Sequence, residues 1–262
     1  MELDEKKLKE TMLKATNEAA KETLAFFRMP LDVENKYKSG FDPVTIADKN
    51  AEKIIREIIS SAFPDHSIYG EELDDKVTNS AYSWVIDPID GTRSFISGLP
   101  VWGTLIGLKK HDKAIAGLMS QPYIGEIFIA INGKAELIQK DKITPLKVSK
   151  KTKLSEATMF TTTPELFSTP KQKAAFRQVE DKVLLSRYGI DCYAYALLAM
   201  GQIDLVIEPD LKPCDIAPLI AIIENAGGII SNWNGQSAEN GGNIIAAASR
   251  EIYDSALEIM NL

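Results

Sequence analysis

A short apolar run that leads straight into two aspartates constrains this chain more than any other feature. Residues 84–95 read WVIDPIDGTRSF. The first three residues predict a buried strand, and Pro88 fixes the backbone so that Asp90 turns back toward Asp87. Burying the Asp87 charge without a partner would be costly. We therefore expect the two carboxylates to face one point and to bind a cation there.

Gly91 and Thr92 follow the two aspartates and open a predicted turn or helix. The free backbone N–H groups at the positive end of a helix suit a phosphate group. One segment thus offers cation ligands on one side and anion donors on the other, which is what a metal-assisted attack on phosphorus requires. The alternative is a structural loop in which Asp90 only caps the next helix.

Two more acidic positions can complete such a cluster. Glu71 follows a predicted strand, SIY, and the flexible residue Gly70. Asp215 opens an apolar helix predicted over 214–226, a position that also fits a plain helix N-cap. Neither position identifies a metal site by itself.

The type of ligand selects the metal. All the candidates are oxygen donors, and the chain has only two histidines and two cysteines, none in the spacing of a zinc site. Carboxylates favour Mg²⁺, with Mn²⁺ as a substitute, and no calcium-loop motif is present. Four carboxylates roughly neutralise two divalent ions, and a phosphate dianion can bring in a third. The sequence lacks a P-loop, a D-x-D nucleophile and a cysteine followed by arginine six residues on, so we expect water to be the nucleophile.

The order of predicted elements indicates an α/β fold without internal repeats. We expect two sub-halves, about 1–150 and about 151–262, that share one core. The first would bind metal and phosphate, and the second would bind substrate and contribute Asp215. The predicted helices are 4–28, one following Asp48, 191–200 and 214–226; the predicted strands are 67–69, 84–86, 101–108, 113–119, 126–131, 156–161, 203–208, 228–231 and 243–248.

Charge and targeting signals narrow the possible partners. The formal net charge is −7, which argues against a nucleic-acid backbone as partner. No segment has the length of a signal peptide core or a membrane span, and two cysteines cannot form a disulfide framework. We expect a cytoplasmic protein with reduced thiols that binds neither nucleic acid nor membrane.

Four segments, in this order, resemble the inositol monophosphatase superfamily of lithium-sensitive, Mg²⁺-dependent phosphatases. They are DPVTIADKNAE at 42–52, GEE at 70–72, WVIDPIDGTRSF at 84–95 and IEPDLKPCDIAPLIAIIENAGG at 207–228. The resemblance extends almost from end to end. It implies a layered α-β-α-β-α sandwich and a homodimer.

The same resemblance assigns roles to individual residues. Two or three Mg²⁺ ions would be bound by Glu71, Asp87, the carbonyl of Ile89, Asp90 and Asp215. Glu71 would also be a catalytic residue. Gly91 and Thr92 would bind phosphate, and the Thr92 hydroxyl, oriented by Asp48, would accept a proton from the attacking water. The alternative for Asp48 is helix N-capping. Cys214 stands where we expect an aromatic residue in most relatives, which leaves the pocket wall undetermined.

Within the superfamily, residues 91–108 and 188–213 look more like the histidinol-phosphate phosphatase branch of histidine biosynthesis than like the inositol branch. Asp191 and Glu208 supply negative charge that suits the ammonium and imidazole of histidinol phosphate. Asp90, Thr92 and Asp215 are expected to contact the substrate as well. Asp191 could instead be a plain helix cap, and Arg187 could meet phosphate, a neighbouring subunit or only a surface ion pair. An inositol-phosphate or broad sugar-phosphate phosphatase is the main alternative; a nucleotide 3′-phosphatase, a bisphosphatase or a non-enzymatic regulatory protein also stays open.

Overall fold

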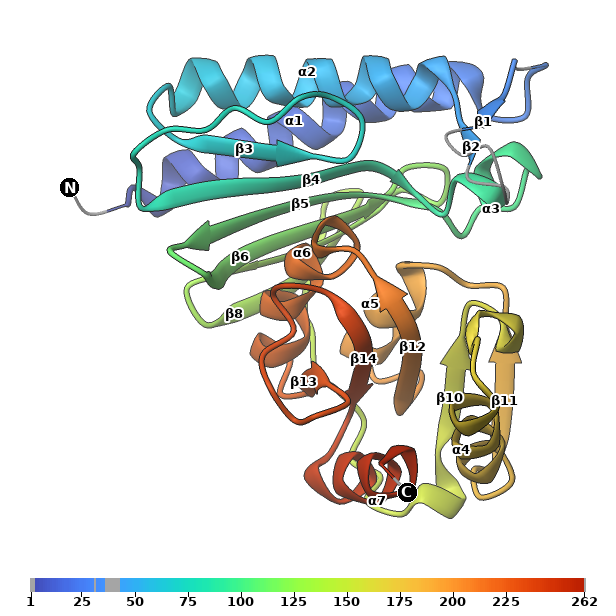
Figure 1. Ribbon diagram of the computed structural model, residues 1–262. Coiled ribbons are helices and arrows are strands. Elements are labelled where there is room, and N and C mark those ends of the chain that lie inside the picture. The colour runs from blue at the N-terminus through green and yellow to red at the C-terminus, as the bar shows by residue number, and fades with distance from the viewer. Residues whose placement is uncertain (1–2, 31, 36–42, 262) are drawn as a thin grey trace.

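Helices and sheets alternate in five layers along the long direction of the molecule (Figure 1). The computed structural model describes residues 3–30, 32–35 and 43–261. The outer helical layer consists of α1 (Glu5–Phe26) and α2 (Ile46–Ala62). It covers a seven-stranded sheet of order β3-β4-β5-β6-β7-β8-β9, followed by α5 (Tyr193–Ala199) and α6 (Pro213–Asn225). A five-stranded sheet of order β11-β10-β12-β14-β13 and the helices α4 (Pro170–Glu180) and α7 (Arg250–Met260) complete the stack.

The larger sheet is antiparallel except for its first pair, β3 and β4, which run parallel. Its strands are β3 (Ser67–Gly70), β4 (Tyr82–Asp90), β5 (Gly103–Lys110), β6 (Lys113–Gln121), β7 (Glu126–Ile131), β8 (Lys134–Gln139) and β9 (Lys142–Pro145). The smaller sheet contains β10 (Thr158–Thr161), β11 (Leu185–Tyr188), β12 (Leu205–Leu211), β13 (Ile229–Asn232) and β14 (Gly242–Ala247). The short elements are β1 (Glu34–Asn35), β2 (Pro43–Val44), α3 (Thr92–Ile96) and the 3₁₀ turns Leu154–Glu156 and Pro164–Leu166. The predicted α-β-α-β-α sandwich is confirmed.

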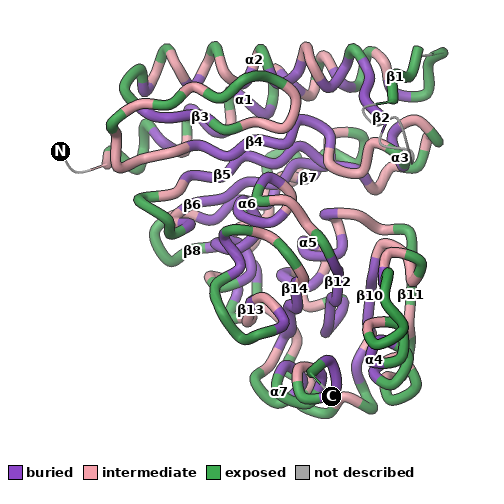
Figure 2. Tube along the Cα trace, viewed as in Figure 1, coloured by how far each residue is buried: buried purple, intermediate pink, exposed green. Residues whose placement is uncertain are grey.

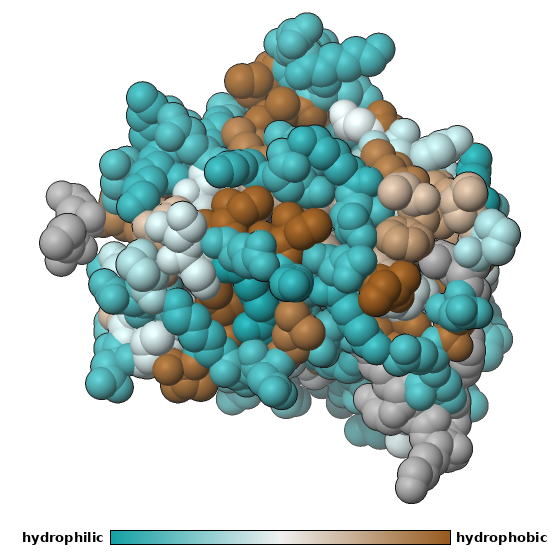
Figure 3. Space-filling model, turned by 90° about the horizontal axis from the view of Figure 1, so that it is seen from above, coloured by the Kyte–Doolittle hydropathy of each residue, from teal (hydrophilic) through white to brown (hydrophobic). Residues whose placement is uncertain are grey.

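The central layer explains how two sheets share one core. Helix α6 is apolar on nearly all sides, with Ile216, Leu219 and Ile223 fully buried, because it packs between the two sheets. The buried elements of the middle layers contrast with the outer turns of α1 and α2, which are partly exposed (Figure 2). Seen from the α1–α2 side, the surface is mainly hydrophilic, with separate hydrophobic groups (Figure 3). The division into two sub-halves stays a proposal.

Glycines bring α6 close to the larger sheet. A Cβ built on Gly117 would lie 1.8 Å from the carbonyl oxygen of Pro218, and one on Gly107 would lie 3.0 Å from the Pro218 Cα. No side chain fits between helix and strands at these points. The close approach fixes the position of α6, whose first turn carries Asp215.

Several elements differ from the sequence-based prediction. The prediction lacked α4, α7, β8, β9, β11 and the two-residue strands β1 and β2. It placed the second helix after Asp48, whereas α2 begins earlier, at Ile46, with Thr45 as the N-cap. Strand β11 is exposed along most of its length, so it has no hydrophobic alternation to detect. In the part of the chain that the structure describes, no helix combines the length and apolar character needed to cross a membrane.

Candidate active site

A cavity of about 210 Å³ lies where the end of β4 meets the first turns of α3, α5 and α6. It brings together the two aspartates of the DPID turn, Asp215 from α6 and Glu71 from the segment after β3. These carboxylates are distant in sequence but share one concave surface. The full lining is Pro43, Glu71, Asp87, Ile89, Asp90, Gly91, Thr92, Arg93, Thr162, Asp191, Lys212 and Asp215.

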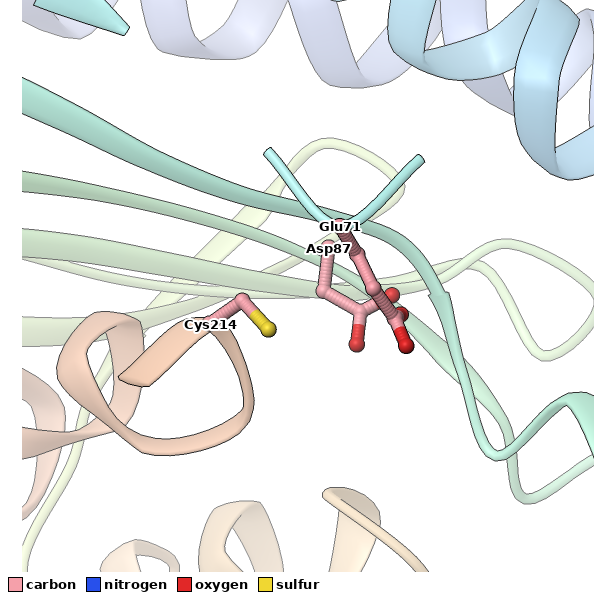
Figure 4. Close-up of side chains that lie close together, drawn as sticks. All are labelled: Glu71, Asp87 and Cys214. Carbon is pink, nitrogen blue, oxygen red and sulfur yellow. The ribbon is translucent and has the colours of Figure 1, made fainter. Parts of the chain in front are cut away.

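Two overlapping groups of side chains have the spacing of metal ligands. Asp87, Asp90 and Asp215 each offer an oxygen, and these atoms lie within 4.8 Å of one another. Glu71, Asp87 and Cys214 form the second group by the same measure, with their side chains directed toward a common space (Figure 4). The carboxylate oxygens fit Mg²⁺, whereas a thiol is a soft ligand that Mg²⁺ does not prefer.

Backbone geometry aims each aspartate into the cavity. The register of β4 against β5 shifts between Asp87 and Asp90, so both residues can turn to the same side. The Ile89 N–H donates to Asp87 Oδ1 at 3.0 Å, and the Cys192 N–H at the start of α5 donates to Asp90 Oδ2 at 2.7 Å. These bonds orient both carboxylates before any ligand arrives.

Asp215 combines a capping role with its place in the cavity. It is the third residue of α6, and its Oδ2 accepts a hydrogen bond from the Lys212 N–H at 2.7 Å. The Cys214 thiol donates to Asp215 Oδ1 at 3.4 Å, so the residue that replaces the expected aromatic lies beside the acidic cluster. The alternative of a plain helix N-cap is therefore wrong for Asp215, because Lys212 is the N-cap of α6 and Asp215 lies in the first turn, beside the other acids.

Burial and mutual repulsion raise the pKa values of the three aspartates in the cluster. Burial and the charges of Glu71, Asp90 and Asp215 raise the pKa of Asp87 well above its usual value. Burial and then the charge of Asp215 do the same to the pKa of Asp90. Burial raises the pKa of Asp215 to about 6. A bound divalent cation would favour the charged forms of all of them.

The proposed anion side of the cavity is formed by Gly91 and Thr92. Gly91 has φ +82° and precedes α3, a backbone conformation that favours glycine. The Thr92 hydroxyl donates to the Ile89 carbonyl at 3.0 Å and lies 3.4 Å from Asp48 Oδ1. Asp48 is not the N-cap of α2: it is the third helical residue, and its Oδ2 accepts from the Thr45 N–H and hydroxyl at 2.8 and 2.6 Å.

The candidate substrate residues have different surroundings. Asp191 lines the cavity, and its Oδ2 accepts from the Ser94 hydroxyl at 2.7 Å. Burial raises its pKa. Glu208 is buried behind the lining, where its Oε1 accepts from the Thr162 N–H at 2.8 Å. Arg187 is exposed on β11 and is not among the lining residues.

Sequence reasoning missed three polar groups of the cavity: Arg93, which follows Thr92 directly, Thr162 and Lys212. Lys212 Nζ forms an ion pair with Glu71 Oε1 at 2.8 Å, and Thr162 joins the wall from the end of β10. The only feature of the sequence that points to Lys212 is its position three residues before Asp215. Nothing in the sequence around Thr162 distinguishes it from other threonines.

Comparison with known proteins shows the family of the chain. The model of the "Inositol monophosphatase family" matches residues 4–261. The chain belongs to this family. It is 43% identical to the "Bifunctional phosphatase IMPL2, chloroplastic" of Arabidopsis thaliana over 244 residues, 89% of this chain and 69% of that protein. It is 35% identical to a "Histidinol-phosphatase" of Chlorobaculum parvum, over 90% of each chain.

A solved structure supports the same assignment for the fold. The inositol monophosphatase from Zymomonas mobilis matches with a TM-score of 0.85 at 33% identity, over 97% of each chain. This member of the inositol monophosphatase family is thus a phosphatase, a hydrolase of phosphoric monoesters.

Proposed function

We propose that this protein is a Mg²⁺-dependent phosphomonoesterase that hydrolyses L-histidinol phosphate to histidinol and phosphate. The observation that carries the proposal is the single cavity in which Glu71, Asp87, Asp90 and Asp215 meet beside Gly91 and Thr92. Acidic ligands on one side and anion donors on the other are the requirements of phosphate-ester hydrolysis.

The residues present fit divalent magnesium. Their donor set consists of carboxylates whose pKa values are raised by burial and by the charges of neighbouring acids. Glu71, Asp87, Asp90, Asp215 and the Ile89 carbonyl would hold two or three Mg²⁺ ions, with Mn²⁺ as a substitute. When bound, such ions lower the pKa of water and neutralise phosphate charge.

The chain's own groups would orient the ester and move the proton. The N–H groups at Gly91 and Thr92 bind the phosphate at the start of α3. The Thr92 hydroxyl takes a proton from the attacking water as Asp48 accepts the hydroxyl proton. Asp48 is suited to this role because it is 1% exposed and is held in place by Thr45.

Charge at the cavity wall supports histidinol phosphate as the substrate. Asp191 presents a carboxylate to the cavity, and an ammonium group would pair with it by a charge-assisted hydrogen bond. Glu208 lies behind Thr162 and adds negative charge at greater depth. The similarity to a histidinol-phosphatase is consistent with this choice.

An inositol-phosphate or broad sugar-phosphate phosphatase is the second candidate, favoured by the match to the Zymomonas mobilis structure. Its substrate would need hydroxyl partners, which Thr162 in the cavity wall could provide, with Glu208 accepting a hydrogen bond from Thr162 behind it. A nucleotide 3′-phosphatase or a bisphosphatase would require additional basic residues for its second phosphate. The homodimer and lithium inhibition are further proposals that follow from the resemblance, and the cytoplasmic location is a proposal that follows from the cysteine usage.

Phosphate release from histidinol phosphate and from inositol 1-phosphate, measured with and without Mg²⁺, tests the proposal. We expect release that requires Mg²⁺ and a higher kcat/KM for histidinol phosphate. A preference for inositol 1-phosphate would favour the second candidate. Full activity after removal of divalent ions by a chelator would overturn the metal assignment.

A further inference from the structure

Two residues of α2 outside the cavity bind the segment that carries Glu71. Glu52 has a completely buried side chain, and its Oε2 accepts from the Glu72 N–H at 2.7 Å. Its Oε1 accepts from the Leu73 N–H at 3.2 Å and from Arg56 Nε at 2.6 Å. A buried carboxylate with N–H donors on both oxygens is a fixed point in the structure.

Arg56 completes the contact from the other side of the backbone. Its Nη2 donates to the Leu73 carbonyl at 3.0 Å, and its Nη1 donates to the Asp74 carbonyl at 2.9 Å. The planar guanidinium thus spans two carbonyls while its Nε bonds to Glu52. Together the two side chains bind both N–H and carbonyl groups of residues 72–74.

The fit extends to the residue before Glu71. A Cβ built on Gly70 would lie 2.0 Å from Glu52 Oε1, so only glycine leaves room for the carboxylate. Gly70 is also the last residue of β3, paired with Ile86 next to Asp87. The backbone on both sides of Glu71 is therefore held, Gly70 by the sheet and residues 72–74 by the Glu52–Arg56 pair.

We propose that Glu52 and Arg56 are positioning residues that set the affinity of the site for divalent ions by fixing the backbone around Glu71. This inference rests on the metal site of the proposed function. Asp48, Glu52 and Arg56 follow one another at four-residue intervals, so they lie on the same face of α2. One helix face thereby positions both the Asp48–Thr92 pair and the Glu71 segment.

The test measures binding of Mn²⁺ to the metal-free protein by calorimetry, without any substrate. Glu52→Gln places an amide donor against an N–H donor, because both Glu52 oxygens accept from N–H groups. We expect its Kd for Mn²⁺ to rise by about 10- to 100-fold, the usual effect of losing an outer partner of a metal ligand. Phosphatase kcat at saturating metal should recover, because affinity and not chemistry is impaired.

Two further variants make the result decisive. Arg56→Lys retains the charge but cannot bond both carbonyls, and it should weaken Mn²⁺ binding in the same direction even if Glu52→Gln does not fold. Glu57→Gln, an exposed glutamate on the same helix, is the matched control and should bind Mn²⁺ like the wild type.

Amide hydrogen exchange gives a readout that general destabilisation would not reproduce. In both test variants, exchange should accelerate at Glu72 and Leu73 before it does so in the strands of the sheet. Unchanged Mn²⁺ affinity in a folded Arg56→Lys or Glu52→Gln protein would overturn the positioning role while leaving the metal site intact. Failure of the wild type to bind Mn²⁺ would overturn both proposals.

Discussion

Asp191 is the residue whose charge best separates the two substrate candidates. Its carboxylate lines the cavity and is oriented by the Ser94 hydroxyl. We expect Asp191→Ala to lower kcat/KM for histidinol phosphate by about 10- to 100-fold, the value of a hydrogen bond to a charged group, and to affect inositol 1-phosphate far less. Steady-state kinetics on both substrates measure the difference.

An isosteric variant separates charge from shape at this position. Asp191→Asn retains the size of the side chain and can still accept from Ser94, but it cannot pair with an ammonium group as an anion. It should reproduce most of the selective loss. Equal losses on both substrates would mean that Asp191 does not recognise the amine.

A residue of the cavity was easiest to predict from the sequence when its neighbours along the chain belong to the same cavity. Asp87, Asp90, Gly91 and Thr92 were predictable because one short turn contains them all. Lys212, from the loop before α6, and Thr162, after β10, join the cavity only through tertiary packing, which no local pattern records. The same holds for Glu52 and Arg56, which lie outside the cavity and contact the segment after Glu71.

At the scale of elements, a clear apolar pattern explains most but not all of the outcomes: α7 was missed although one of its faces is buried. Strands β4 to β7 and helix α6 were predictable because apolar residues mark them clearly. Strand β9 is short and mostly exposed, and β11 forms an edge of the smaller sheet, so polar sequence conceals them. Helix starts were also displaced, since Asp48 and Asp215 are third residues of their helices rather than caps.

The contact of α6 with β6 gives a prediction about an element. Gly117→Ala would place a methyl group 1.8 Å from the Pro218 carbonyl oxygen, so helix and strand must separate. Overpacking of this kind lowers the free energy of unfolding by about 1–3 kcal/mol. Because α6 carries Asp215, we also expect weaker Mn²⁺ binding. Urea unfolding and calorimetry measure the two effects.

Gly133→Ala is the matched control for this substitution. Gly133 has open space around it, but its φ of +75° is unfavourable for alanine, at a cost of about 1 kcal/mol. The control should lose some stability and retain its metal affinity. If Gly117→Ala binds Mn²⁺ as tightly as Gly133→Ala, the placement of α6 does not govern the site.

At the scale of the whole molecule, the buried acids make the free energy of unfolding depend on pH and on bound metal ions. Burial raises the pKa of Asp215 to about 6 and that of Glu208 to about 7, and burial with neighbouring charge raises those of Asp87 and Asp90. An acid with a raised folded-state pKa keeps its proton longer in the folded state than in the unfolded chain. Its contribution to stability is therefore present below the unfolded-state pKa and is lost as pH rises through the folded-state pKa.

The metal-free protein should accordingly become less stable between about pH 4 and pH 7, with Asp215 alone contributing on the order of 3 kcal/mol. His66 opposes the trend, because burial lowers its pKa and stability is lost when it is protonated at acid pH. Mg²⁺ binds the ionised carboxylates, so its stabilising effect should grow with pH and reach about 2.7 kcal/mol at a concentration of 100 Kd. Urea unfolding with chelator or Mg²⁺ across this range measures both trends.

Asp90→Asn isolates the carboxylate cluster in this measurement, because the contribution of His66 cancels between variant and wild type. Asparagine can still accept from the Cys192 N–H, but it removes one charge from a group of mutually repelling acids. We expect the metal-free variant to be more stable than the wild type at neutral pH, to gain less stability from Mg²⁺ and to release no phosphate. Lower metal-free stability at neutral pH would show that Asp90 does not repel its neighbours. Turnover near that of the wild type would show that Asp90 does not hold the metal. Repulsion in the empty cluster and affinity for cations are two consequences of one arrangement of charge, so the same substitution must change them together.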